Sequence, residues 1–175
     1  MMAMALASTM MLSAAPVMAA TPSPNDKSVP TPKNQTVTVS KGKVSTYTDG
    51  TAIYVKAKKT KKKTFTVPST VTVGQVKYKI VGVKAKFLSK ATKVTYVKIP
   101  ASVKKVPAKA FSKPKSLKKI RFYSKSQIKF SKKSFQGKST KKMTIYLSKK
   151  MSKKAYKATI KSLKKAGFKG KIKRK

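Results

Sequence analysis

A repeat with a period near 23 residues constrains this chain more than any other feature. Three short stretches carry the same apolar pattern, and Val97, Ile120 and Met143, which begin them, are 23 positions apart each time. A period of this length is too short for a separate domain and too long for a hairpin. Each unit is therefore expected to be one turn of a solenoid that buries its apolar residues against the neighbouring turns.

A second apolar element precedes each of these stretches at constant spacing. Five residues separate Val83 from Leu88, Val106 from Phe111, and Phe130 from Phe135. The step from Phe111 to Phe135 is 24, as an insertion of one residue in a connecting loop would give. We expect the inward residues of the middle turn to be Val106, Ala110, Phe111, Leu117, Ile120 and Phe122.

The residues before the repeat predict a strand-rich N-terminal cap at 36–64. Apolar and polar residues alternate in 36–39 and in 52–55, and Asp49-Gly50 lies between them as a turn signal. The solenoid is predicted to span 65–148, because the layout of the residues from Phe65 repeats that of the residues from Val97. Residues 76–80 are expected to form an extra strand inside the first interval.

A C-terminal capping helix and basic tail are predicted at 149–175. Ser152 is a good N-cap residue, and Tyr156, Ile160 and Leu163 follow at a spacing that places them on one helix face. Gly167 provides the stop signal. The expected architecture is therefore mainly β with short connecting helices or turns: a solenoid of about four turns between a β cap and a helical cap.

The first 20 residues are apolar and small and carry no charge, which is typical of a secretory signal peptide. Residues 21–35 are rich in Pro, Ser, Thr and Asn, and we expect a flexible spacer there. No basic residue precedes Lys27, so an uncleaved anchor is the alternative interpretation of the first segment. Either interpretation predicts a secreted or cell-surface protein. Cleavage would leave a mature chain without a membrane span, because no second apolar run in the sequence could cross a bilayer.

Charge is the second constraint on function. The chain has 45 Lys plus Arg against 2 Asp plus Glu, a net charge of +43 on 175 residues, and only Arg121 and Arg174 are arginines. Stacked turns would place Lys98 over Arg121 and Lys119 over Lys142 about 4.8 Å apart. Each such pair costs about 0.8 kcal/mol in water before screening. A surface of this kind concentrates polyanions, so anionic polymers or glycans are the expected partners.

Composition argues against an enzyme. The chain has no His, no Cys and no Glu, so carboxylate pairs, thiolate nucleophiles and metal-ligand clusters are scarcely available. Ser and Lys are so abundant that their proximity would say nothing about a Ser-Lys dyad. We expect no cofactor, no metal and no catalytic residue.

The repeat residues resemble a known family. Ala110-Phe111, the Ile-Pro-x-Ser-Val run at 99–103 and the Leu117 and Ile120 pair are similar to BspA-type leucine-rich-repeat proteins of bacterial surfaces, over about 45–175. Ser112 and Lys113 replace the cysteine and glycine usual after the Ala-Phe pair. The resemblance implies a secreted or surface-exposed right-handed solenoid used in adhesion, without a catalytic residue.

A candidate binding face follows from strand alternation, because residues next to the buried positions point outward. Its members are Tyr96, Lys98, Lys119, Arg121, Tyr123, Lys142 and Tyr146. The alternative is that these lysines are only a solvated surface and the tyrosines cover the edges of the core. Two other functions stay open: nonspecific binding of extracellular nucleic acid, and membrane activity through the basic, amphipathic helix at 152–166. A protein partner is also open.

Overall fold

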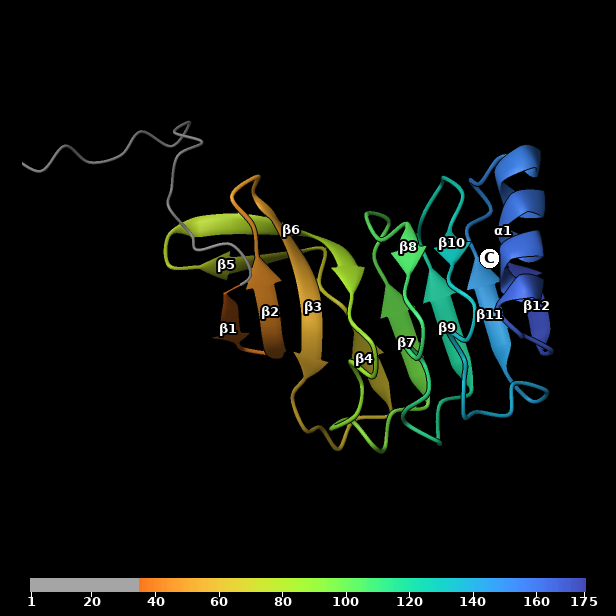
Figure 1. Ribbon diagram of the computed structural model, residues 1–175, viewed down its shortest axis with the longest axis horizontal. Coiled ribbons are helices and arrows are strands. Elements are labelled where there is room, and N and C mark those ends of the chain that lie inside the picture. The colour runs from red at the N-terminus through yellow and green to blue at the C-terminus, as the bar shows by residue number, and fades with distance from the viewer. Residues whose placement is uncertain (1–34) are drawn as a thin grey trace, which may run out of the picture.

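The computed structural model describes residues 35–175 (Figure 1). The expected signal peptide, and the expected spacer apart from residue 35, lie outside this range. The described part of the chain is mainly β and contains one α-helix, at its C-terminal end.

The first sheet has five strands in the order β1-β2-β3-β6-β5. Its strands are β1 (Thr36–Val39), β2 (Gly42–Thr46), β3 (Thr51–Ala57), β5 (Thr70–Val73) and β6 (Val76–Val83). Neighbours are antiparallel except β3 and β6, which are parallel. The sheet curls so that its two edge strands, β1 and β5, approach each other (Figure 1).

Tyr54 joins this sheet to the rest of the core. Its side chain is completely buried, and its hydroxyl donates a 2.7 Å hydrogen bond to the carbonyl oxygen of Lys41. Its ring packs edge-on against Phe65 and Phe87, with centroids 5.9 and 6.4 Å away. Burial raises the pKa of the Tyr54 hydroxyl to about 12.

The second sheet contains the repeat strands, and all of its neighbouring strands are parallel. The order is β12-β11-β9-β7-β4, formed by β4 (Thr64–Thr66), β7 (Tyr96–Ile99), β9 (Lys119–Phe122), β11 (Thr144–Leu147) and β12 (Lys171–Arg174). Val97 lies between Phe65 and Ile120, as the repeat predicts. Because β5 and β6 follow β4 in the chain yet belong to the first sheet, the two sheets interleave along the sequence.

The predicted register of the third repeat strand is wrong by two residues. Ile145, and not Met143, lies opposite Ile120, so this step is 25 residues. Met143 is buried, but it precedes the strand. A shift of two residues keeps every side chain on the same face of a strand, so the apolar pattern cannot distinguish the two registers.

A short second layer completes the repeat. The strands β8 (Lys105–Val106) and β10 (Lys129–Phe130) are parallel, and Val106 lies opposite Phe130, which confirms the predicted step of 24. The Phe130 ring lies 5.4 Å from the ring of Phe122 in β9, so the two parallel layers face each other across the core. Between them, ring contacts link Phe87, Phe111, Phe135 and Phe168 with centroids 5.2 to 5.8 Å apart.

The helix α1 (Lys153–Lys165) lies where the sequence predicts a helix. The Ser152 side chain accepts a hydrogen bond from the Ala155 N–H, and Gly167 follows the helix with a φ of 84°. The helix lies against β10. Its side-chain hydroxyls therefore come within hydrogen-bonding reach of the edge of β10 that is not paired with β8.

Candidate anion-binding surface

The second sheet has one apolar and one polar face. Along β7 and β9, Val97, Ile99, Ile120 and Phe122 are fully buried. The residues between them point to the other side, where Lys119 is exposed and Tyr96, Lys98 and Arg121 are partly exposed. Strand alternation therefore brings these four predicted site residues onto one solvent-facing surface, and Tyr146 in β11, which lies opposite Arg121, joins them as a fifth.

Two rows of side chains cross this surface from strand to strand. One row runs through Lys98, Arg121, Tyr146 and Lys173, so the expected stacking of Lys98 over Arg121 is present. The other row runs through Tyr96, Lys119, Thr144 and Lys171. In the first row positive charge is continuous from β7 to β9, whereas in the second row β7 contributes the neutral Tyr96. Both rows have neutral residues at β11.

The expected stacking of Lys119 over Lys142 does not occur. Thr144 occupies the position beside Lys119, and Lys142 lies in the exposed turn before β11. This error follows directly from the two-residue register shift. Lys142 is thus separate from the rows that hold the other candidate residues.

Aromatic rings on this surface lie beside cations. The Lys98 Nζ atom is 5.7 Å from the centroid of the Tyr96 ring, and the Arg121 guanidinium carbon is 4.7 Å from that of Tyr123. Lys175 similarly places its Nζ atom 5.8 Å from the Tyr146 ring. Tyr123 follows β9 directly and is 39% exposed, the largest exposure of any large hydrophobic residue in the described part of the chain. These contacts hold the cations close to the sheet.

The sequence analysis missed the contribution of β12 to this surface. Lys171 and Lys173 continue the two rows beyond β11. Arg174, in the same strand, stacks its guanidinium 4.9 Å from the Tyr156 ring and donates hydrogen bonds to the carbonyl oxygens of Lys149 and Met151. The alternation of basic residues around Ile172 is the signal that could have identified this strand.

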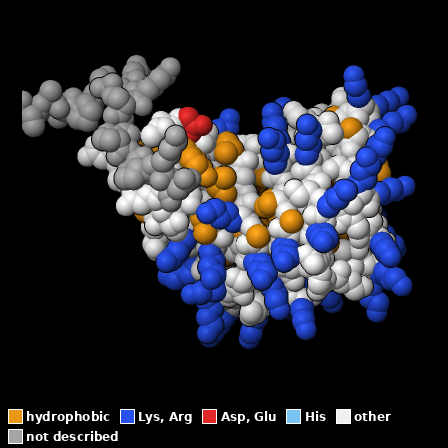
Figure 2. Space-filling view, in the orientation of Figure 1, with side chains coloured by type: hydrophobic (Ala, Val, Ile, Leu, Met, Phe, Trp, Pro, Cys, Tyr) orange, Lys and Arg blue, Asp and Glu red, His pale blue; other side chains and the backbone are white. Residues whose placement is uncertain are grey.

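Little negative charge offsets this surface. Asp49 is the only acidic residue in the described range and lies in the turn between β2 and β3. Hydrogen bonds from Thr51, first from its hydroxyl and then from its backbone N–H, lower the pKa of the Asp49 carboxyl. In Figure 2 the red of acidic side chains appears at one spot over the first sheet, whereas the blue Lys and Arg side chains project from much of the visible surface.

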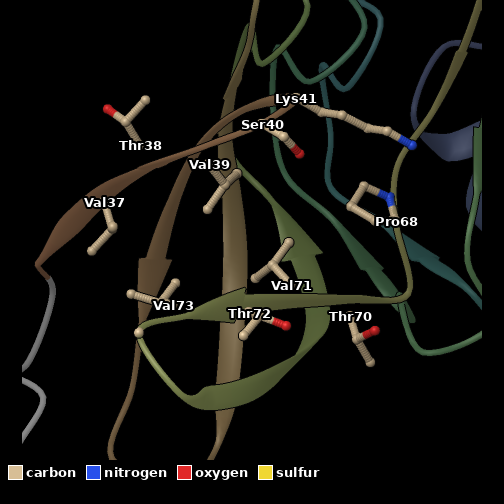
Figure 3. A pocket seen from close by; sticks show the side chains of 11 residues that line it. Val37, Thr38, Val39, Ser40, Lys41, Pro68, Thr70, Val71, Thr72 and Val73 are labelled. Atoms are coloured by element: carbon tan, nitrogen blue, oxygen red, sulfur yellow. The ribbon is translucent and has the colours of Figure 1, made fainter.

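A hollow of about 610 Å³ lies elsewhere, between the edge strands β1 and β5. Figure 3 shows Val39 and Val71 projecting toward each other across it. Its lining is otherwise largely Val and Thr, with Lys41 as the one charged residue. None of the seven candidate site residues lines this hollow, so it does not overlap the basic surface.

No family model and no curated protein matches the chain. One solved structure, a leucine-rich cell surface protein from Faecalibacterium prausnitzii, is similar, with 19% sequence identity and a TM-score of 0.49. The match covers 65% of this chain and 32% of that protein. Among residues 35–175, no helix has the length and apolar character needed to cross a membrane, and no cluster of three His, Cys, Asp or Glu side chains could hold a metal.

Proposed function

We propose that this protein is a non-enzymatic leucine-rich-repeat protein of the bacterial cell surface or surroundings that binds anionic polymers. In this proposal the parallel strands are turns of a solenoid of about four units, with the first sheet and α1 as its caps. The apolar segment at 1–20 supports secretion, because its composition is typical of a signal peptide. The absence of His, Cys and Glu from the sequence supports a role in binding and not in catalysis.

The observation that carries the proposal is the pairing of Lys98 with Arg121 on the solvent face of the parallel sheet. Like charges directly opposite each other in a sheet destabilise it, and no described carboxylate lies in either row to offset them. An anionic ligand would remove this repulsion and release its own counterions. The neighbouring tyrosines would give the ligand apolar contact area beside the charges.

The test is a binding titration of the full chain against heparin, long-chain polyphosphate, single-stranded DNA and anionic vesicles over a range of NaCl concentrations. We expect binding to weaken as salt is added, with log Kd rising linearly with the logarithm of the NaCl concentration. A triple variant, Lys98→Gln with Lys119→Gln and Arg121→Gln, should bind more weakly and with a shallower salt slope. No binding to any of these polyanions at low salt would refute the proposal, and vesicle leakage without polymer binding would favour membrane activity.

A further inference from the structure

Three lysines occupy an unfavourable backbone conformation at equivalent positions of successive turns. Lys86, Lys109 and Lys133 have φ values of 53°, 57° and 63°, in the left-handed region. Non-glycine residues are uncommon there, and Asn is tolerated much better than Lys. The described part of the chain uses glycine at its five other positive-φ positions, so lysine is the exception at these three.

These three residues form one ladder. The backbone N–H of Lys86 donates to the carbonyl oxygen of Lys109 at 3.0 Å, and that of Lys109 donates to Lys133 at 2.9 Å. We call Lys86, Lys109 and Lys133 the turn ladder. All three side chains are exposed. Hydrogen-bonded neighbours of this kind are about 4.8 Å apart, so the ladder places three like charges along roughly 10 Å.

The second layer adds charge beside the turn ladder. Lys105 in β8 lies opposite Lys129 in β10, and both are exposed. Because β8 and β10 lie across the core from β9, this surface differs from the face of Lys98 and Arg121. Every residue of the turn ladder is a lysine, whereas the rows on that face also contain neutral residues.

The ladder ends at a hollow of about 480 Å³ beside the C-terminal end of α1. Its lining includes Lys132, Lys133 and Lys165, with Gly137 and Gly167, where a side chain would meet open space. Lys138 also lines it, but its Nζ atom already donates to the carbonyl oxygens of Pro114 and Lys115 at 2.8 Å. The exposed lysines of the hollow therefore extend the ladder by at least one further basic site.

We infer that the turn ladder and this hollow form the principal binding site for a linear polymer of phosphate or sulfate groups that runs along the stack of turns. The inference rests on the proposed function, since it assigns the anionic polymer to a specific site. Backbone strain and charge repulsion both act against lysine at these positions, and a bound polyanion relieves the second of them. Lysine presents a point charge without a planar fork, which suits phosphate or sulfate groups without fixed orientation.

Nucleic acid fits this site less well. Proteins that bind single-stranded nucleic acid stack its bases on exposed aromatic rings. The ladder and the exposed lining of the hollow contain no exposed ring, because Phe135, the one aromatic residue in the lining, is buried. A polymer without aromatic groups is therefore the ligand class that the site selects.

The test replaces the ladder by residues that keep its backbone. A triple variant, Lys86→Asn with Lys109→Asn and Lys133→Asn, removes three charges and suits the left-handed conformation better, so it should fold and melt a few degrees higher. The matched control is Lys43→Gln with Lys56→Gln and Lys77→Gln, which removes three exposed charges from the first sheet. Binding of heparin and of polyphosphate is measured by titration at several NaCl concentrations, with single-stranded DNA as a third ligand.

The inference predicts that the ladder variant loses about tenfold or more in affinity for heparin and polyphosphate at low salt, with a salt slope shallower by about one unit for each contacting lysine. The first-sheet control should change affinity less than about threefold. Equal losses of affinity in the ladder variant and the first-sheet control would mean diffuse attraction and would overturn the inference. A loss of affinity confined to the Lys98, Lys119 and Arg121 variant would overturn it as well. Tighter binding of single-stranded DNA than of either other polymer would also overturn it. In these three cases the proposed function stands, whereas absence of binding by the unmodified chain would refute both.

Discussion

The backbone N–H of Phe130, in β10, donates a 2.7 Å hydrogen bond to the Oγ atom of Ser162 in α1. Two residues earlier, the N–H of Ile128 donates to Thr159 Oγ1 at 3.0 Å. Helix hydroxyls thus satisfy backbone donors that a further parallel strand would otherwise satisfy. This arrangement explains how α1 can cover β10 without leaving buried polar groups unpaired.

Replacing Thr159 by Val keeps its shape but removes the acceptor for the Ile128 N–H. Because Thr159 is fully buried, the donor is left unsatisfied, at a cost of about 1–3 kcal/mol in the free energy of unfolding. Urea denaturation and amide exchange at Ile128 measure the effect. The control Thr159→Ser keeps the hydroxyl and removes only the methyl group, so it should leave the Ile128 amide protected. Unchanged exchange at Ile128 in the Val variant would contradict this role for Thr159.

Phe111 is the centre of the aromatic core. Its ring contacts Phe87, Phe122 and Phe135 at centroid distances of 5.8, 6.3 and 5.5 Å, and it is fully buried. We expect Phe111→Ala to lower the free energy of unfolding by about 3–5 kcal/mol through lost burial and a residual cavity. Thermal and urea denaturation would show this, and a loss below about 1 kcal/mol would mean that the site refills by repacking.

The repeat could be predicted from the sequence because each buried residue recurs at its own interval. Val97 with Ile120, and Val106 with Phe130, lie opposite each other as their spacing indicated. The Met143 register could not be fixed, because Leu147 offers an equally apolar position two residues after Ile145. The alternation of polar and apolar residues along the strands predicted that Lys98 and Arg121 point outward. The turn ladder could not be predicted in this way, because it is defined by positive backbone φ values, which a lysine in the sequence does not indicate.

The close approach of Gly170 to the chain before β11 gives a third prediction. A Cβ atom at Gly170 would overlap the carbonyl oxygens of Met143 and Thr140. Since these are backbone atoms, the overlap cannot be relieved by a side-chain rotation. We expect Gly170→Ala to detach or shift β12, which would raise amide exchange at Lys171 and lower the melting temperature. The control Gly137→Ala meets no atom within 4 Å, so any loss there would come from its φ of 76° alone.

The buried Tyr54 hydroxyl predicts a specific response to high pH. Its pKa of about 12 in the folded protein lies above the value of about 10 in an unfolded chain. The unfolded state therefore loses this proton first, so the contribution of Tyr54 to stability is complete below about pH 10 and declines between pH 10 and 12. Two pKa units correspond to about 2.7 kcal/mol.

The comparison with Tyr54→Phe isolates this effect from lysine titration, which both proteins share. At pH 7 the variant should be less stable by about 0.5–1.5 kcal/mol, because it lacks the hydrogen bond to Lys41. The difference should shrink and then reverse as the pH rises from about 10 to about 12. Urea denaturation at each pH measures it, and a difference that stays constant over this range would show that Tyr54 ionises equally in both states.

Like-charge neighbours across the sheets predict that salt stabilises this protein. Such neighbours are Lys43 and Lys56, Lys105 and Lys129, and Lys98 and Arg121. Each pair costs about 0.8 kcal/mol in water before screening. The Debye length falls from about 30 Å at 0.01 M salt to about 10 Å at 0.1 M, so the long-range part of the repulsion decays first. The melting temperature should therefore rise by several degrees between about 10 and about 300 mM NaCl, with most of the gain at the low end.

The matched control for this salt effect is the Lys43, Lys56 and Lys77 variant. It should show a smaller rise in melting temperature than the unmodified chain, because it carries three fewer charges and lacks one of the facing pairs. Thermal denaturation of both proteins over the same NaCl series measures the difference. A melting temperature independent of NaCl in both proteins would mean that repulsion among these lysines does not limit the stability of the fold.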